Sequence, residues 1–226
     1  RWGILLRTFK LRLSFAQTFH FTAIGTLGNL FLLGAVGGDA VRMFYAWRVL
    51  GQGTGRLAIS ILADRALGLL ALIAFAAFVT LFHWRQLQQV PALAILATSV
   101  LIVFVVAVGG GLTLLIAPAL ARAIAKRLSP WPRIARLMRQ IDDVIIMARE
   151  NPLLLSAAFA LALVVQACTV AAIVLIAQVL QIGTLSSADY MFAVPLTLVS
   201  NTLPLTPNGL GVGEVAFDQI CRWLEP

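Results

Sequence analysis

The sequence predicts an all-α membrane protein, a polytopic bundle of transmembrane helices that contains two oppositely oriented re-entrant elements. Of its 226 residues, 61% are hydrophobic and 12% are charged, and the mean hydropathy is +0.96. Soluble domains have roughly 45–50% apolar and about 25% charged residues, so this composition indicates an integral membrane protein. The net charge of +8 does not indicate nucleic-acid binding, because the basic residues form short blocks between long apolar segments.

Three apolar segments are predicted to cross the membrane. They cover residues 57–82, 92–117 and 153–180, and each exceeds the length of about 20 apolar residues that a spanning helix needs. The third has a clear start, with Asn151 as the N-cap and Pro152 as the first helical residue.

The basic residues favour one topology for the segment before these spans. Four lie in residues 1–12, three in 42–56 and seven in 118–150, against one in 83–91. If residues 14–36 crossed the membrane, the first two blocks would lie on opposite sides. If this segment enters and returns on one side, all three large blocks face the cytoplasm, as the positive-inside rule favours. We therefore predict a first re-entrant hairpin.

The turn of this hairpin is predicted at three glycines, Gly34, Gly37 and Gly38, which permit unusual backbone conformations. Asp39 is predicted to cap a half-helix that runs from about Ala40 to Leu50. Non-helical backbone at membrane depth persists only where it is buried in protein or lines a cavity. The segment is therefore expected to face a polar cavity.

A second element with a similar pattern, an asparagine, a glycine-containing turn and then an acidic residue, is predicted at residues 201–217, "NTLPLTPNGLGVGEVAF". Two prolines interrupt helical structure, three glycines permit a tight turn, and an acidic residue opens the next helix. These residues are Pro204, Pro207, Gly209, Gly211, Gly213 and Glu214. Because three crossings separate the two elements, the second is expected to enter from the opposite side. Paired broken segments of this kind point to a transporter-like site near the midplane.

Asp64 and Arg65 lie inside the first predicted span. Each would cost on the order of 2.5–3.5 kcal/mol at the centre of a membrane helix, so each needs a partner. Adjacent residues point about 100° apart on a helix and do not pair well with each other. We expect Asp64 to pair with Arg42, and Arg65 to pair with Glu214 or a lipid phosphate. Two roles remain open for these charges, a fixed ion pair that locks the bundle and the handling of a substrate.

No catalytic motif is present in the sequence. It has no phosphate-binding glycine loop with its lysine, no clustered metal ligands and no serine–histidine–aspartate set in a motif context. We therefore expect no enzyme activity, no metal and no cofactor. An intramembrane enzyme that uses Asp39, Asp64 and Glu214 as acids or bases is the remaining alternative.

Three motifs together resemble the lysylphosphatidylglycerol synthase transmembrane-region family, also called flippase-like domain proteins. They are "GGDAVR" at residues 37–42, "ADRALGLLAL" at 63–72 and "LPLTPNGLGVGE" at 203–214. The resemblance covers nearly the whole chain and implies one domain over residues 1–226, a piece of a longer multi-pass protein of the bacterial or archaeal inner membrane. Carried over by motif, it implies functional positions at Asp39, Arg42, Asp64, Arg65, Gly209, Gly211 and Glu214.

The best-understood relatives move an aminoacylated phospholipid from the inner to the outer leaflet, and a separate soluble domain performs the aminoacyl transfer. The resemblance thus implies translocation of a phospholipid or other lipid-linked amphiphile, with an anionic or aminoacylated phospholipid as partner. A lipid-modifying transferase is a further expected partner. The alternative is a non-transporting membrane protein that binds lipid or a glycosyltransferase and regulates lipid composition. The oligomeric state stays open, a homo-oligomer included.

Overall fold

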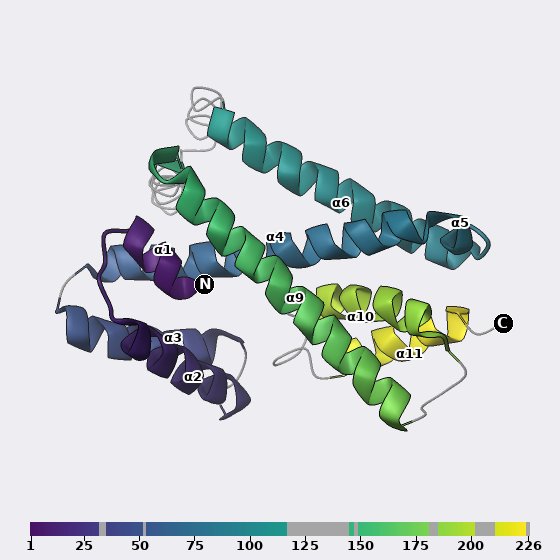
Figure 1. Cartoon of the computed structure of the whole chain (residues 1–226), viewed down its shortest axis with the longest axis horizontal. Helices are drawn as coiled ribbons and strands as arrows, with labels where there is room; N and C mark the ends of the chain where they lie inside the picture. Colours follow the sequence, from purple (N-terminus) through teal and green to yellow (C-terminus); the bar gives the residue numbers. More distant parts are fainter. Residues whose placement is uncertain are drawn as a thin grey trace, which may run out of the picture.

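The computed structural model describes residues 1–31, 35–51, 53–116, 145–146, 149–180, 185–201 and 211–224. Within these ranges the regular structure is helical, and no strand occurs. The main elements (Figure 1) are α1 (Trp2–Thr8), α2 (Phe15–Phe31), α3 (Ala35–Leu50), α4 (Thr54–Phe82), α5 (Trp84–Leu87), α6 (Pro91–Ile116), α9 (Pro152–Leu180), α10 (Ser187–Asn201) and α11 (Val212–Leu224). The predicted all-α class is confirmed.

The three predicted spans are also confirmed as long apolar helices. Among the described helices, α4, α6 and α9 are long and apolar enough to cross a membrane. They contain 29, 26 and 29 residues, or about 39–44 Å at a rise of about 1.5 Å per residue. The hydrocarbon core is about 30 Å thick, so each helix can cross it with a tilt. Pro152 is the first residue of α9, as predicted.

Helix α4 contacts most of the other elements. Its first half packs against α1 and α3, and its second half packs against α10. Helix α9 crosses α4, and the α2–α3 and α10–α11 pairs lie towards opposite ends of α4 (Figure 1). The α2–α3 pair and helix α10 therefore contact the same spanning helix at different levels.

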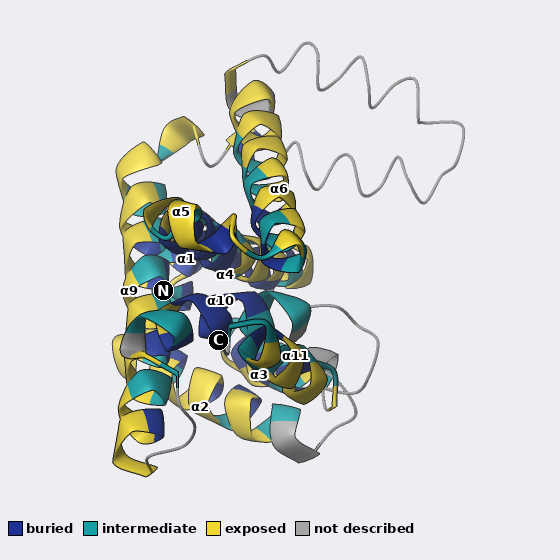
Figure 2. Ribbon diagram, turned by 90° about the vertical axis from the view of Figure 1, so that its right-hand side faces the viewer, coloured by how far each residue is buried: buried dark blue, intermediate teal, exposed yellow. Residues whose placement is uncertain are grey.

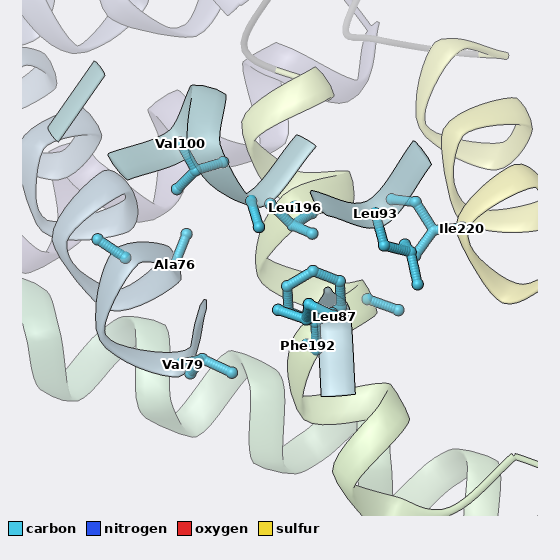
Figure 3. Packing of buried hydrophobic residues seen from close by; sticks show 11 residues of the cluster. Ala76, Val79, Leu87, Leu93, Val100, Phe192, Leu196 and Ile220 are labelled. Carbon is cyan, nitrogen blue, oxygen red and sulfur yellow. The ribbon is translucent and has the colours of Figure 1, made fainter. Parts of the chain in front are cut away.

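Two hydrophobic clusters hold this arrangement together. The larger joins the second half of α4 to α5, α6, α10 and α11 (Figure 3), through Ala76, Ala77, Val79, Leu87, Leu93, Ala97, Val100, Phe192, Ala193, Leu196 and Ile220. The alanines of α4 allow neighbouring backbones to approach closely, as small residues do in membrane helix packing. The smaller cluster joins the region of α1 to α2, α3 and the first half of α4, through Trp2, Leu6, Phe9, Leu11, Phe21, Ala46, Leu57, Ile59 and Ile61.

The outer faces of α6 and α9 are apolar and exposed (Figure 2). Ile95 and Val105 of α6 and Leu153 and Val179 of α9 are among the exposed side chains. Exposed apolar faces this long would be unfavourable in water but suit the hydrocarbon of a bilayer.

The first predicted re-entrant element is a helical hairpin, but its turn differs from the prediction. Helices α2 and α3 pack against each other, and Gly34 lies outside the described residues. Gly37 and Gly38 lie within α3, and Asp39 is its fifth residue. The predictions that these two glycines form the turn and that Asp39 caps a half-helix from Ala40 are wrong. Re-entry of the hairpin into the membrane stays a prediction.

The second predicted element is described only at its two ends. Helix α10 ends at Asn201 and α11 begins at Val212, while Pro204, Pro207 and Gly209 lie outside the described residues. Gly211 has a φ of +85°, a conformation that favours glycine, so it is a turn residue at the start of α11, whereas the re-entrant turn stays a prediction. Gly213 instead lies inside α11. The orientation of this element stays a prediction.

Candidate functional site

The α2–α3 hairpin is held by direct contact between the two helix backbones. A methyl group added at Gly38 would overlap the carbonyl oxygen of Gly25, and one added at Gly28 would lie 3.2 Å from the Cα atom of Gly38. The amide nitrogen of Gly38 also donates a hydrogen bond of 2.9 Å to Oδ1 of Asn29. Asn29 thus ties α2 to the first turn of α3, where helix N–H groups most need acceptors. The glycines serve close packing rather than a turn.

Replacing Asn29 with alanine is expected to destabilise the hairpin by about 1–2 kcal/mol, because it leaves the Gly38 amide without its side-chain acceptor. Unfolding in mixed detergent micelles with increasing SDS would measure this difference. Thr26→Ala is the matched control: Thr26 lies on the same helix and is exposed, and its hydroxyl bonds only to its own helix, at Thr22. Equal stability of the two variants would contradict this role of Asn29.

Five charged side chains form one continuous network between α3, α4 and the start of α1. Asp64 accepts from Nε of Arg1 at 2.7 Å and from Nη1 of Arg42 at 3.2 Å. Asp39 meets Nη2 of Arg42 at 3.0 Å and Nε of Arg65. Each carboxylate therefore carries two guanidinium partners, and Arg42 joins the two halves of the network.

The network lies deep along α4. Asp64 follows Thr54 by ten residues, a distance of about 15 Å along the helix and about half the thickness of a hydrocarbon core. It is buried, with 5% of its surface exposed. A carboxylate this buried has little contact with solvent, so its charge depends on the two arginines that contact it.

Helix α1 runs antiparallel to the first half of α4. Arg1 contacts Asp64, the indole nitrogen of Trp2 donates to Oγ of Ser60 at 3.2 Å, and Leu11 lies beside Gly53. Arg1 and Arg42, which the charge distribution assigned to cytoplasmic blocks, both pair with Asp64, and the side of the membrane that these blocks face stays a prediction. The Arg42 guanidinium also lies 4.9 Å from the Trp2 ring centroid, a distance typical of a cation–π contact.

Of the predicted pairs, Asp64 with Arg42 is confirmed and Arg65 with Glu214 is wrong. Arg65 pairs with Asp39 instead. Glu214 accepts a hydrogen bond of 2.8 Å from the amide nitrogen of Gly211, which satisfies a donor at the start of α11 as a capping glutamate does. The structure therefore brings Asp39, Arg42, Asp64 and Arg65 together and keeps Glu214 apart from them.

A cavity of about 470 Å³, here called the arginine cavity, adjoins the network. Its polar side consists of Arg1, Arg7, Thr18, Thr22, Arg42 and Asp64. Its apolar side consists of Trp2, Gly3, Ile4, Leu13, Phe15, Phe19, Leu161 and Val165. Guanidinium groups recognise phosphate and carboxylate oxygens through paired N–H donors, so this cavity can bind an anion beside an apolar surface.

A second cavity, of about 300 Å³ and here called the glutamate cavity, lies between α9, α10 and α11. It is lined by Ile173, Val194, Thr197, Leu198, Gly213, Glu214 and Phe217. Ile173 follows Val165 of the arginine cavity by eight residues on α9, or about 12 Å along that helix. Within the described ranges, no three His, Cys, Asp or Glu side chains converge to hold a metal ion.

Sequence reasoning missed Arg1, Arg7 and Trp2 as members of the site. The only signal is the run "RWGILLR", in which two arginines flank an apolar stretch. A run of seven residues is too short to identify as a membrane helix.

The family model described as "Lysylphosphatidylglycerol synthase TM region" matches residues 1–224. This confirms the resemblance inferred from the three motifs. Neither a curated protein nor a solved structure matches the chain.

Proposed function

Because the chain belongs to the lysylphosphatidylglycerol synthase TM-region family, we propose that it moves a phospholipid or another lipid-linked amphiphile between the leaflets of the membrane. The family and the three apolar helices make it a membrane protein tied to lipid metabolism. The observation that carries the proposal is the arginine cavity, which joins three arginines and Asp64, a residue inside the apolar helix α4, to an apolar surface. Ionisable groups inside a membrane are costly and usually functional.

The two cavities give the proposed path. A headgroup enters the arginine cavity and then reaches the glutamate cavity, about 12 Å further along α9, while the acyl chains stay in the lipid. Each cavity includes residues of one hairpin, with Thr18 and Arg42 from α2–α3 and Thr197 and Glu214 from α10–α11. The two hairpins are therefore suited to open the cavities alternately, as the broken elements of transporters do.

In this proposal the chain itself makes and breaks no covalent bond. Each of Asp39 and Asp64 already carries two guanidinium partners, which suits anion binding better than acid–base chemistry. A lipid-modifying transferase would supply the substrate where the headgroup is modified. We place the basic loops in the cytoplasm and the protein in the inner membrane, following the positive-inside rule.

Liposomes that contain the full-length protein would test the proposal, with inner-to-outer movement of labelled phosphatidylglycerol and lysylphosphatidylglycerol as the measurement. We expect movement well above that of empty liposomes, and a reduction of about tenfold or more in both Arg65→Ala and Glu214→Gln. Glutamine keeps an acceptor for the Gly211 amide, so Glu214→Gln is expected to fold. Arg222→Gln is the control, because it removes an exposed charge that pairs with Asp218 on the same helix.

The alternative is a membrane protein that binds lipid or a transferase without moving lipid. One observation favours it: the network pairs every one of its carboxylates within the protein, as a fixed structural lock would. Well-folded protein that moves none of the tested lipids would support this alternative and count against translocation.

A further inference from the structure

Building on the proposed function, we propose that the arginine cavity binds a lipid with an anionic headgroup in preference to one with an aminoacylated, cationic headgroup. The charge of the lining, the basic residues of an adjoining hollow and the apolar side of the cavity each support this assignment.

The charges that line the cavity favour an anion. Three arginines, Arg1, Arg7 and Arg42, face one carboxylate, Asp64. Asp64 already contacts both Arg1 and Arg42, so an incoming ammonium group would have to displace a guanidinium that is then left unpaired in a buried place. Arg7 is exposed and takes part in none of the ion pairs between described residues. A phosphate can therefore bind Arg7 without breaking the network.

The positive charge continues from the cavity towards the start of α4. Arg7 also lines an adjoining hollow together with Lys10, Arg12 and Leu13. Because α1 runs antiparallel to α4, the basic side chains extend from Lys10 and Arg12 near Gly53 to Arg1 beside Asp64. A cleft lined by one sign of charge raises the local concentration of ligands of the opposite sign.

The apolar side indicates that the anion belongs to a lipid. The rings of Phe15 and Phe19 on α2 stack with their centroids 6.5 Å apart, and both are exposed, by 84% and 67%. Leu161 and Val165 of α9 face the same cavity and are also exposed. Helices α2 and α9 therefore both present exposed apolar side chains beside the cavity. Acyl chains can lie along these side chains while the headgroup occupies the cavity.

Native mass spectrometry of the full-length protein would test this preference. The protein is released from nanodiscs that contain equal amounts of phosphatidylglycerol, lysylphosphatidylglycerol and phosphatidylcholine, and the retained lipids are counted. We expect phosphatidylglycerol to be retained about tenfold more than lysylphosphatidylglycerol. Arg7→Gln should lower this retention about tenfold, whereas Arg7→Lys, which keeps the charge, should preserve most of it. Arg56→Gln is the control, because Arg56 is exposed on the first turn of α4 and lines neither hollow.

Two results would overturn the inference: retention of lysylphosphatidylglycerol at least equal to that of phosphatidylglycerol, or equal retention by Arg7→Gln and Arg56→Gln. Displacement of the lipid by millimolar glycerol 3-phosphate, which has the phosphate without acyl chains, would overturn the assignment to a lipid. The retention of lipid is measured independently of its translocation, so the experiment can contradict the anionic preference without contradicting translocation, and the reverse. If the protein retains phosphatidylglycerol through Arg7 but moves no lipid in liposomes, this inference holds and translocation is overturned. If it moves lipid without preferring an anionic headgroup, translocation holds and this inference is overturned.

Discussion

Replacing Asp64 with alanine is expected to destabilise the protein by about 3–5 kcal/mol and to abolish lipid movement. The variant leaves Arg1 and Arg42 without the carboxylate that both contact. The Arg42 side chain is 8% exposed and cannot turn to water without moving α3. Removing one partner of a buried ion pair costs far more than removing an exposed pair, because the remaining charge stays desolvated.

The measurement is SDS-induced unfolding of the purified protein, with lipid movement in liposomes as the second readout. Asp218→Ala is the matched control: Asp218 also pairs with an arginine, at 2.9 Å, but both side chains are more than half exposed. Its loss should cost less than about 1 kcal/mol. Similar losses of stability in Asp64→Ala and Asp218→Ala would show that burial does not increase the contribution of the Asp64 ion pairs to stability.

Replacing Gly38 with alanine is expected to cost about 2–3 kcal/mol, because the added methyl group overlaps backbone and side-chain atoms of α2. The overlap involves the carbonyl oxygen of Gly25 and the side chain of Asn29. Neither helix can relieve it without separating from the other. Asp39 follows directly in α3, so we expect the contact of Asp39 with Arg65 to weaken and lipid movement to fall as well.

Gly110→Ala provides the control for this substitution. Gly110 also lies inside a helix, α6, but a methyl group added there meets no atom within 4 Å. Alanine is the better helix former, by up to about 1 kcal/mol, so this variant should be as stable as the original protein or more stable. Equal destabilisation by Gly38→Ala and Gly110→Ala would contradict the close packing of α2 on α3.

The spanning helices could be predicted from the sequence because hydropathy and length define them almost without tertiary information. The predicted range 57–82 and the observed Thr54–Phe82 differ by three residues at one end. The pairing of Asp64 with Arg42 could also be predicted, since a charge inside a membrane helix needs a partner.

The rest of the network could not be predicted because the start of α3 was placed too late. With a helix that begins at Ala40, Asp39 lies outside it. In the structure the helix begins at Ala35, so Asp39 and Arg42 are three residues apart on one helix face, where side chains are neighbours. Both then face α4, and Asp39 takes the position beside Arg65 that was predicted for Glu214.

The arginine cavity could not be predicted because it depends on tertiary contacts of a short helix. Helix α1 has seven residues, which is too short to be stable in isolation or to be recognised as a helix from its sequence. Their position follows from packing on α4, where Trp2 contacts Ser60 and Arg1 contacts Asp64. Sequence reasoning on single segments therefore finds the spans and misses the site between them.

The close contact of α2 with α3 also has an electrical consequence. Joined through Gly25, Gly28 and Gly38, the two helices pack as one unit, and residues 15–50 contain one acidic and two basic residues, Asp39, Arg42 and Arg48. A membrane potential does work on net charge, about 2.3 kcal/mol per elementary charge per 100 mV. A displacement of this hairpin across the field would therefore move one net positive charge, and the voltage would act on the hairpin as well as on the lipid that we propose it moves. An inside-negative potential drives an anionic headgroup outward and holds a cationic one back.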